Sequence, residues 1–128
     1  MAQTRLDLAN RTPSYLVLVP EMLVAHDIAL TISDFDAGAV VICARSKGEA
    51  VAALYLVSTL EIAFIADCPG VFLGSDLHSH ILAKGGRVVM LGVEAERKGP
   101  TSVFDVLCQP FDTEAVIAKL RAGHPCFG

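Results

Sequence analysis

The sequence has few charged residues and no cluster of basic ones. Lysine and arginine together number 10 among 128 residues, they are dispersed along the chain, and the formal net charge is −4. Proteins that bind the phosphates of nucleic acids gather basic side chains on one face. The sequence therefore argues against a nucleic-acid partner.

The sequence also lacks the short motifs that hold metals or phosphates. No Cys-x-x-Cys, Gly-x-Gly-x-x-Gly or Walker pattern occurs. His78 and His80 are two residues apart, which on a helix directs them to different sides, whereas helical metal ligands are three or four residues apart. We therefore predict no metal site, no cofactor and no catalytic residue, and we expect that the protein is not an enzyme.

The cysteines offer no sign of redox or nucleophilic chemistry. Most of them lie in or at the ends of apolar runs, where a free thiol acts as a small hydrophobic group; they are Cys43, Cys68, Cys108 and Cys126. Cys68 closely follows a predicted strand, but no histidine near it in the sequence is placed to act as its base. We predict free, unreactive thiols.

Long apolar segments are missing as well. No apolar run approaches the roughly 20 residues that cross a bilayer, and residues 1–7 are polar, without the apolar core of a signal peptide. We therefore expect a cytoplasmic protein with no membrane partner. The mean hydropathy of +0.54 is nevertheless high, which predicts a sheet that is buried on both faces.

What is present is an alternation of short apolar runs and helical patterns. The runs predict strands at residues 15–19, 39–44, 62–66, 87–91 and 103–107. Helical periodicity predicts helices over about 21–35, 49–54, 73–84 and 112–120. Ser46 is a predicted N-cap, and Gly99-Pro100 predicts that any helix between the fourth and fifth strands is short or irregular.

A helix between successive strands requires the strands to be parallel. Five such units predict an α/β fold with a doubly wound, five-stranded parallel sheet in the flavodoxin-like order 2-1-3-4-5. We predict one domain at residues 14–122, with an N-terminal extension at 1–13 and a C-terminal tail at 123–128.

Four segments resemble the strands of response-regulator receiver domains, the CheY-like superfamily. Residues 15–23, YLVLVPEML, resemble the opening strand of receivers associated with bacterial sensory histidine kinases, which typically continues into an acidic pair and Glu-Met-Leu. Residues 61–66, 86–92 and 107–112 resemble the third, fourth and fifth strands. The resemblance covers Tyr15 to Leu120 and makes Pro110 a cis-proline candidate.

The resemblance implies a reaction whose groups are missing here. Receivers transfer a phosphoryl group to an aspartate, with Mg²⁺ held partly by an acidic pair, a lysine that pairs with the product and a hydroxyl side chain that senses it. The matching positions here carry other residues. Val19 and Pro20 replace the acidic pair, with Glu21 beside them, Ala66 replaces the phosphoacceptor, Gly92 replaces the hydroxyl residue, and Gln109 replaces the lysine.

Asp67 leaves an alternative open. A one-residue slip or bulge at the end of the third strand would bring its carboxylate to the pocket. In a regular strand, Ala66 and Asp67 cannot both point into one site, and Asp67 is then a loop residue that accepts backbone N–H groups. Even at the site, Asp67 is predicted to lack a lysine partner.

The resemblance and these replacements predict a degenerate, non-phosphorylatable receiver, a pseudo-receiver that serves as a protein–protein interaction module in bacterial two-component signal transduction. The first alternative is an active phosphoacceptor receiver that uses Asp67 with Mg²⁺, and the second is a flavodoxin-like domain that binds a small molecule or a metal. The implied partners are a histidine kinase, an output domain, another receiver or a second copy. Candidate interface residues are Val103, Phe104 and Val116.

Overall fold

The computed structural model describes residues 12–122, so the predicted tail and nearly all of the predicted extension lie outside the described residues. Five parallel strands form one sheet in the order β2-β1-β3-β4-β5, which confirms the predicted topology. The strands are β1 Ser14–Leu18, β2 Val40–Ala44, β3 Ile62–Ala66, β4 Arg87–Leu91 and β5 Asp105–Val106.

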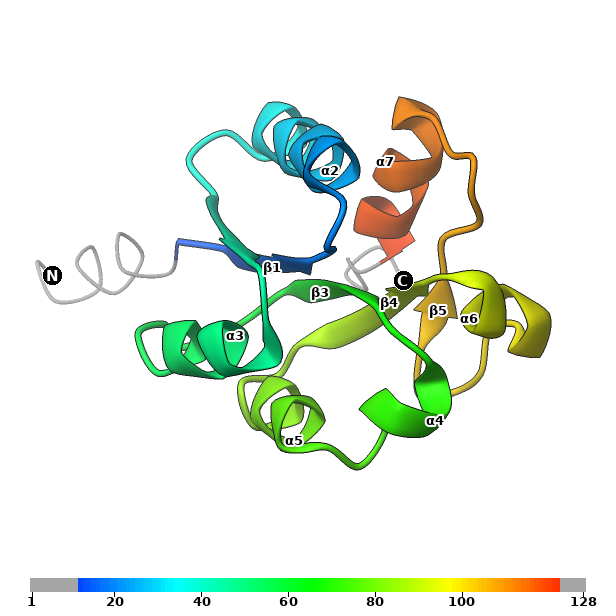
Figure 1. The fold of residues 1–128 in the computed structure, drawn as a ribbon. Coiled ribbons are helices and arrows are strands. Elements are labelled where there is room, and N and C mark those ends of the chain that lie inside the picture. The colour runs from blue at the N-terminus through cyan, green and yellow to red at the C-terminus, as the bar shows by residue number, and fades with distance from the viewer. Residues whose placement is uncertain (1–11, 123–128) are drawn as a thin grey trace, which may run out of the picture.

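The helices lie on both faces of this sheet (Figure 1). One face is covered by α2 Met22–Phe35 and α7 Thr113–Ala122, and the other by α3 Lys47–Leu54, α4 Pro69–Phe72 and α5 Asp76–Ala83. The short helix α6, Val93–Lys98, follows β4. None of the helices within residues 12–122 combines the length and the apolar character that crossing a membrane requires.

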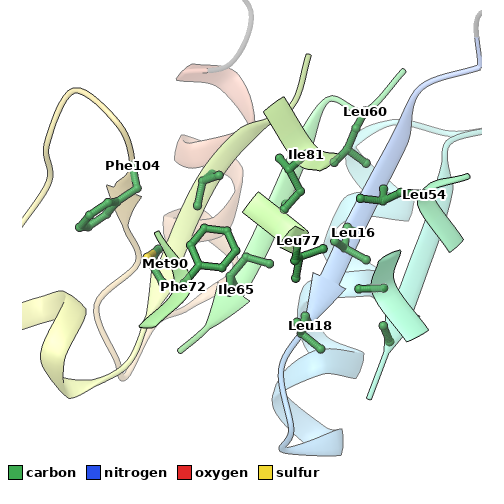
Figure 2. Packing of buried hydrophobic residues seen from close by; sticks show 14 of the residues in the cluster. Leu16, Leu18, Leu54, Leu60, Ile65, Phe72, Leu77, Ile81, Met90 and Phe104 are labelled. Atoms are coloured by element: carbon green, nitrogen blue, oxygen red, sulfur yellow. The ribbon is translucent and has the colours of Figure 1, made fainter. Parts of the chain in front are cut away.

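The core consists of two apolar clusters that share the sheet. On β1, Leu16 and Leu18 pack toward the α3 and α5 side, whereas Tyr15 and Val17 pack toward α2 and α7. Figure 2 shows the first cluster, in which Leu77 and Ile81 of α5 lie among side chains of β1 and β3. Because successive side chains of a strand point to opposite faces, burial on both faces explains the unbroken apolar runs.

The helix predicted over residues 73–84 is observed as α5, which begins only at Asp76, whereas the preceding short helix α4 was not predicted. Gly74 between them has φ +88°, a conformation that favours glycine. Ser75 is the N-cap of α5, and its Oγ accepts the N–H of His78 at 3.3 Å. The glycine and the capping serine therefore end one helix and begin another inside a continuous apolar pattern.

The fifth strand is shorter than predicted. The hydroxyl of Thr101 accepts the N–H groups of Val103 and Phe104, at 3.0 and 3.2 Å, and the N–H of Thr101 donates to the carbonyl of Phe104 at 2.8 Å. This turn removes both residues from the ladder, so β5 begins at Asp105.

Several smaller predictions are confirmed. Ser46 caps α3, with its Oγ accepting the N–H of Glu49 at 3.1 Å. Helix α6 has only 6 residues and ends before Gly99. The peptide bond between Gln109 and Pro110 is cis.

The predicted partner interface is largely wrong at the level of side chains. Val103 is 47% exposed, but Phe104 and Val116 are buried, at 3% and 0%. Phe104 lies in the cluster on the α3 and α5 side. Val116 lies on the buried face of α7 and packs against the sheet. Both residues stabilise the core and cannot contact a partner.

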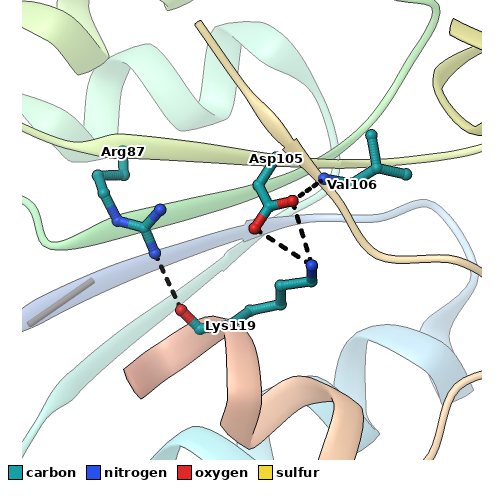
Figure 3. A network of polar contacts seen from close by, with 4 residues as sticks. All are labelled: Arg87, Asp105, Val106 and Lys119. Carbon is teal, nitrogen blue, oxygen red and sulfur yellow. Dashed lines mark hydrogen bonds and ion pairs between the residues drawn. The ribbon is translucent and has the colours of Figure 1, made fainter. Parts of the chain in front are cut away.

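A polar network holds α7 to the sheet (Figure 3). The Nζ of Lys119 lies 3.1 and 3.2 Å from the two carboxylate oxygens of Asp105, and Asp105 Oδ1 also accepts the N–H of Val106. Arg87 of β4 donates to the main-chain carbonyl of Lys119 at 2.9 Å. The last helix is thereby tied to both β4 and β5.

Candidate functional site

The carboxyl ends of the parallel strands meet along one rim of the sheet, which is where ligands bind in doubly wound folds. Ala66 pairs with Leu91 in the ladder between β3 and β4, so the residues that follow these strands lie together. A Cβ on Gly92 would lie 3.8 Å from the main-chain oxygen of Asp67. The structure thus brings the ends of the third and fourth strands into contact.

The end of β1 offers no oxygen ligands at the positions of the family's acidic pair. Val19 is buried, 6% exposed, and packs in the cluster beneath α2 and α7. Pro20 is exposed and has an aliphatic side chain. Glu21 is exposed and is the N-cap residue of α2, and its main-chain carbonyl accepts the N–H of Ala25 at 2.9 Å.

The end of β3 places two neighbouring residues on opposite faces of the sheet. Ala66 packs against the cluster beneath α2 and α7. Asp67 is directed to the other side, where its Oδ2 lies 2.9 Å from the Nζ of Lys47, the first residue of α3. Its Oδ1 accepts the N–H of Cys68 at 2.7 Å. The alternation expected of a regular strand is therefore observed, with Asp67 bound to the backbone as predicted for a loop residue.

Asp67 has a lysine partner that was not predicted, Lys47, although the lysine that the family carries after the fifth strand is absent as predicted. The Lys47 side chain is 42% exposed and that of Asp67 is 21% exposed. The lysine comes from the start of α3 and not from the end of β5, where Gln109 stands. Its position after β2 was the available signal, because residues that follow any strand of a parallel sheet reach the same rim.

Gly92 constrains the end of β4. Its φ is +123° and its ψ is 164°, a region that is essentially restricted to glycine. Its carbonyl accepts the N–H of Glu96, so this backbone conformation begins α6. A serine or threonine at this position would be strained, and the hydroxyl of the family is therefore incompatible with the local backbone.

The end of β5 is held by a carboxylate. The main-chain N–H of Gln109 donates to Oε2 of Glu96 at 2.9 Å, which joins α6 to the segment before Pro110. Gln109 is exposed, and its amide side chain carries no charge. The rim thus has no cation at the position of the family's lysine.

The donor set does not fit the Mg²⁺ that the receiver fold implies. Hard cations need several oxygen ligands, and Val19, Pro20, Ala66 and Gly92 have none in their side chains. Asp67 is already paired with Lys47. Within residues 12–122, no three His, Cys, Asp or Glu side chains are arranged to hold a metal ion.

The two histidines that were considered as metal ligands, His78 and His80, make contacts within the fold. His78 is buried, its Nδ1 accepts the N–H of Gly74 at 3.2 Å, and its ring lies 5.0 Å from that of Phe72. The ring of His80 instead lies edge-on to the ring of Tyr55, with 5.2 Å between the ring centroids. The two histidines therefore occupy separate surroundings.

The cysteines within the described part of the chain are free thiols, as predicted, but they are exposed and do not fill the core. They are Cys43, Cys68 and Cys108. Partial desolvation of its thiol by neighbouring atoms raises the pKa of Cys43 above its ordinary value. Cys126 lies outside the described residues.

Several solved structures of receivers have a similar arrangement of strands and helices. A CheY-like response regulator receiver domain protein of Methanospirillum hungatei has 25% sequence identity and a TM-score of 0.59, covering 84% of this chain and 90% of that one. Chemotaxis response regulator CheY4 of Vibrio cholerae has 18% identity and a TM-score of 0.65, covering 88% and 99%. A receiver protein of Sinorhizobium medicae has 16% identity and a TM-score of 0.60, covering 89% and 98%.

Sequence comparison alone finds no match, either to a protein-family model or to a curated protein. The likeness therefore lies in the backbone, in the strand order and in the placement of the helices. The chain has the fold of the CheY-like response regulator receiver domains.

Proposed function

We propose that this receiver-like domain does not accept a phosphoryl group and that it acts as a protein–protein interaction module in two-component signal transduction, without catalytic activity of its own. The observation that carries the proposal is the direction of the Asp67 side chain and the contacts that it makes. It is the carboxylate that directly follows β3, and it is directed to the α3 side, where Lys47 and the N–H of Cys68 bind it. The phosphoacceptor position itself is Ala66.

A carboxylate in these contacts is a poor nucleophile for phosphoryl transfer. Attack on a phosphoryl group requires a free oxygen beside a metal ion that offsets the charge. Oδ1 of Asp67 accepts a hydrogen bond and Oδ2 is ion-paired with Lys47, and within residues 12–122 no group of three His, Cys, Asp or Glu side chains forms a metal cage. The product would carry nearly two negative charges, and Gln109 provides no cation to pair with them.

The proposal is tested by titrating the full chain with Mg²⁺ and beryllofluoride, a phosphate mimic, while amide NMR signals are recorded. We expect no saturable shift at Ala66, Asp67 or Gly92, whereas a receiver that accepts phosphate shifts under the same conditions. Saturable shifts that disappear in Asp67→Asn would establish the active receiver instead.

The active-receiver alternative has one specific observation in its favour, the ammonium of Lys47 at 2.9 Å from Asp67. If this pair replaces the usual aspartate and lysine, acetyl phosphate with Mg²⁺ will add a phosphoryl group to the chain, visible by mass spectrometry. The addition would then be lost in Asp67→Asn and strongly reduced in Lys47→Met. Under our proposal none of the three proteins is modified.

The proposed partners are a histidine kinase, an output domain or another receiver. Because phosphate has no differential contact with this rim, it cannot shift the population of a binding-competent state. The affinity for such a partner is therefore expected to be the same with and without Mg²⁺ and beryllofluoride. Of the three apolar interface candidates, Val103 remains exposed enough to contribute.

A further inference from the structure

Strand β2 is the longer of the two edge strands, and within residues 12–122 no other strand pairs with its outer side. The strand order leaves β2 and β5 at the two edges, and β5 has only 2 residues. The 5 residues of β2, VVICA, include no charge and no proline. Natural proteins usually protect such edges with charged residues, prolines or bulges, because an open edge pairs readily with another strand.

The backbone of β2 is arranged for such pairing. The N–H of Val40 donates to the carbonyl of Pro13 at 2.8 Å, so Val40 faces β1. Alternation along the strand then directs the N–H and C=O groups of Val41 and Cys43 toward the open side. The N–H of Arg45 is bound by Glu49 Oε1 at 2.7 Å, which limits the available ladder to these two residues.

Apolar side chains flank this edge on both faces of the sheet. On the α3 side, a hollow of about 370 Å³ is lined by Val40 and Ile42 and by Leu56, which is 87% exposed. On the α2 side, a hollow of about 400 Å³ is lined by Cys43 and by Leu23, which is 81% exposed. Exposed apolar surface on both sides of an open strand is typical of a surface that a partner covers.

We propose that β2 pairs in antiparallel orientation with β2 of a second copy of this chain, joining the two sheets across a two-fold axis. With Ile42 on the axis, Val41 of each copy lies opposite Cys43 of the other. All the outward N–H and C=O groups of these two residues are then satisfied.

Charge complementarity selects the second copy and the antiparallel direction. Asp34 precedes β2 and Arg45 follows it, and both residues are exposed. Antiparallel pairing therefore brings the acidic end of each strand to the basic end of the other. Parallel pairing would place like charges together, which opposes association.

The test uses sedimentation velocity of the full chain over a range of concentrations. We expect the wild type to reach the mass of two chains, and Cys43→Lys to weaken association at least about tenfold, since a charge would lie in the paired edge. Leu82→Lys, which places the same charge on an exposed residue of α5, is the control and is expected to associate as the wild type does.

A second variant and a site-specific measurement keep the proposal falsifiable. Val41→Pro removes an outward N–H that the monomer does not need, and it is expected to remain folded and become monomeric. In the wild type, hydrogen exchange at Val41 and Cys43 is expected to slow as concentration rises. A chain that stays monomeric, or a dimer that persists in both β2 variants without protection of these amides, would overturn the proposal.

Discussion

At the scale of single residues, the direction of one carboxylate decides the chemistry of the rim. Ala66 and Asp67 are adjacent, yet the first packs beneath α2 and α7 while the second contacts Lys47 at the start of α3. A strand that remains regular to its end cannot direct both to one face. Moving a carboxylate into the receiver position would therefore require Ala66 to change, and not a rotation of Asp67.

Gly92 gives a prediction about the backbone of the same rim. With φ at +123°, Gly92→Ala is expected to destabilise the fold by about 1–3 kcal/mol, because a side chain strains this conformation. Gly48→Ala is the matched control, since Gly48 lies in α3 and a Cβ there would have only ordinary contact, 4.0 Å from Ser46 Oγ. It is expected to be neutral or stabilising by up to about 1 kcal/mol. Urea unfolding of both variants measures the difference, and equal stabilities would contradict it.

Tyr15 gives a prediction about pH. The side chain is 1% exposed, and its hydroxyl donates to Asp36 Oδ2 at 3.0 Å. Burial first, and then the hydrogen bond and charge of Asp36, raise the pKa of Tyr15. Because the folded chain holds this proton more tightly than the unfolded chain, the stabilisation is complete below about pH 10 and is lost as the pH rises further.

Tyr15→Phe is therefore expected to lower stability by about 1 kcal/mol near neutral pH, through loss of the hydrogen bond. It should also show a smaller loss of stability than the wild type between about pH 9 and about pH 11. Urea unfolding at a series of pH values measures both effects, with Tyr55→Phe, at a tyrosine that is 68% exposed, as the control. An unchanged alkaline slope would show that Tyr15 does not cause it.

Individual residues were predictable where one local rule applied. Ser46 was identified as a cap because serine before a helix accepts a free N–H. The contact of Lys47 with Asp67 was not predicted, because the residues are 20 positions apart and only the folded sheet brings them together. The burial of Phe104 and Val116 also depended on tertiary packing, which apolar character alone does not locate.

At the scale of elements, periodicity placed most segments but not their interruptions. The strands β3 and β4 begin and end where the apolar runs predicted, because burial on both faces requires unbroken apolar character. The later start of α5 was missed because Leu73 and Leu77 keep a helical spacing across Gly74. A positive φ at glycine and a capping serine outweighed that spacing.

The start of α5 can be tested through its cap. Ser75→Ala removes the oxygen that accepts the N–H of His78 and is expected to cost about 1 kcal/mol. Ser79→Ala lies within the same helix on its exposed side and is the control, expected to be neutral or slightly stabilising, since alanine is the better helix former. Urea unfolding compares the two, and equal effects would show that the cap does not stabilise α5.

At the scale of the whole molecule, topology was more predictable than chemistry. The alternation of apolar runs and helices leaves few arrangements of a parallel sheet, and the predicted order is the observed one. The site depends instead on single side chains and on their direction at the strand ends. A sequence pattern can show that Gln109 replaces a lysine, but it cannot show that Glu96 binds the backbone at that position.

The shared sheet also predicts how the molecule unfolds. Each central strand contributes side chains to both clusters, so neither face can lose its packing while the other keeps its own. Ile28→Val, on the buried face of α2, and Ile81→Val, on the buried face of α5, each remove a fully buried methyl group. Each is expected to lower the free energy of unfolding by about 0.5–1.5 kcal/mol. In urea titrations followed by NMR, each variant should lower the midpoint equally for amides of α2 and of α5. If Ile28→Val moved the α2 transition alone, the two faces would be separate folding units and the sheet would not couple them.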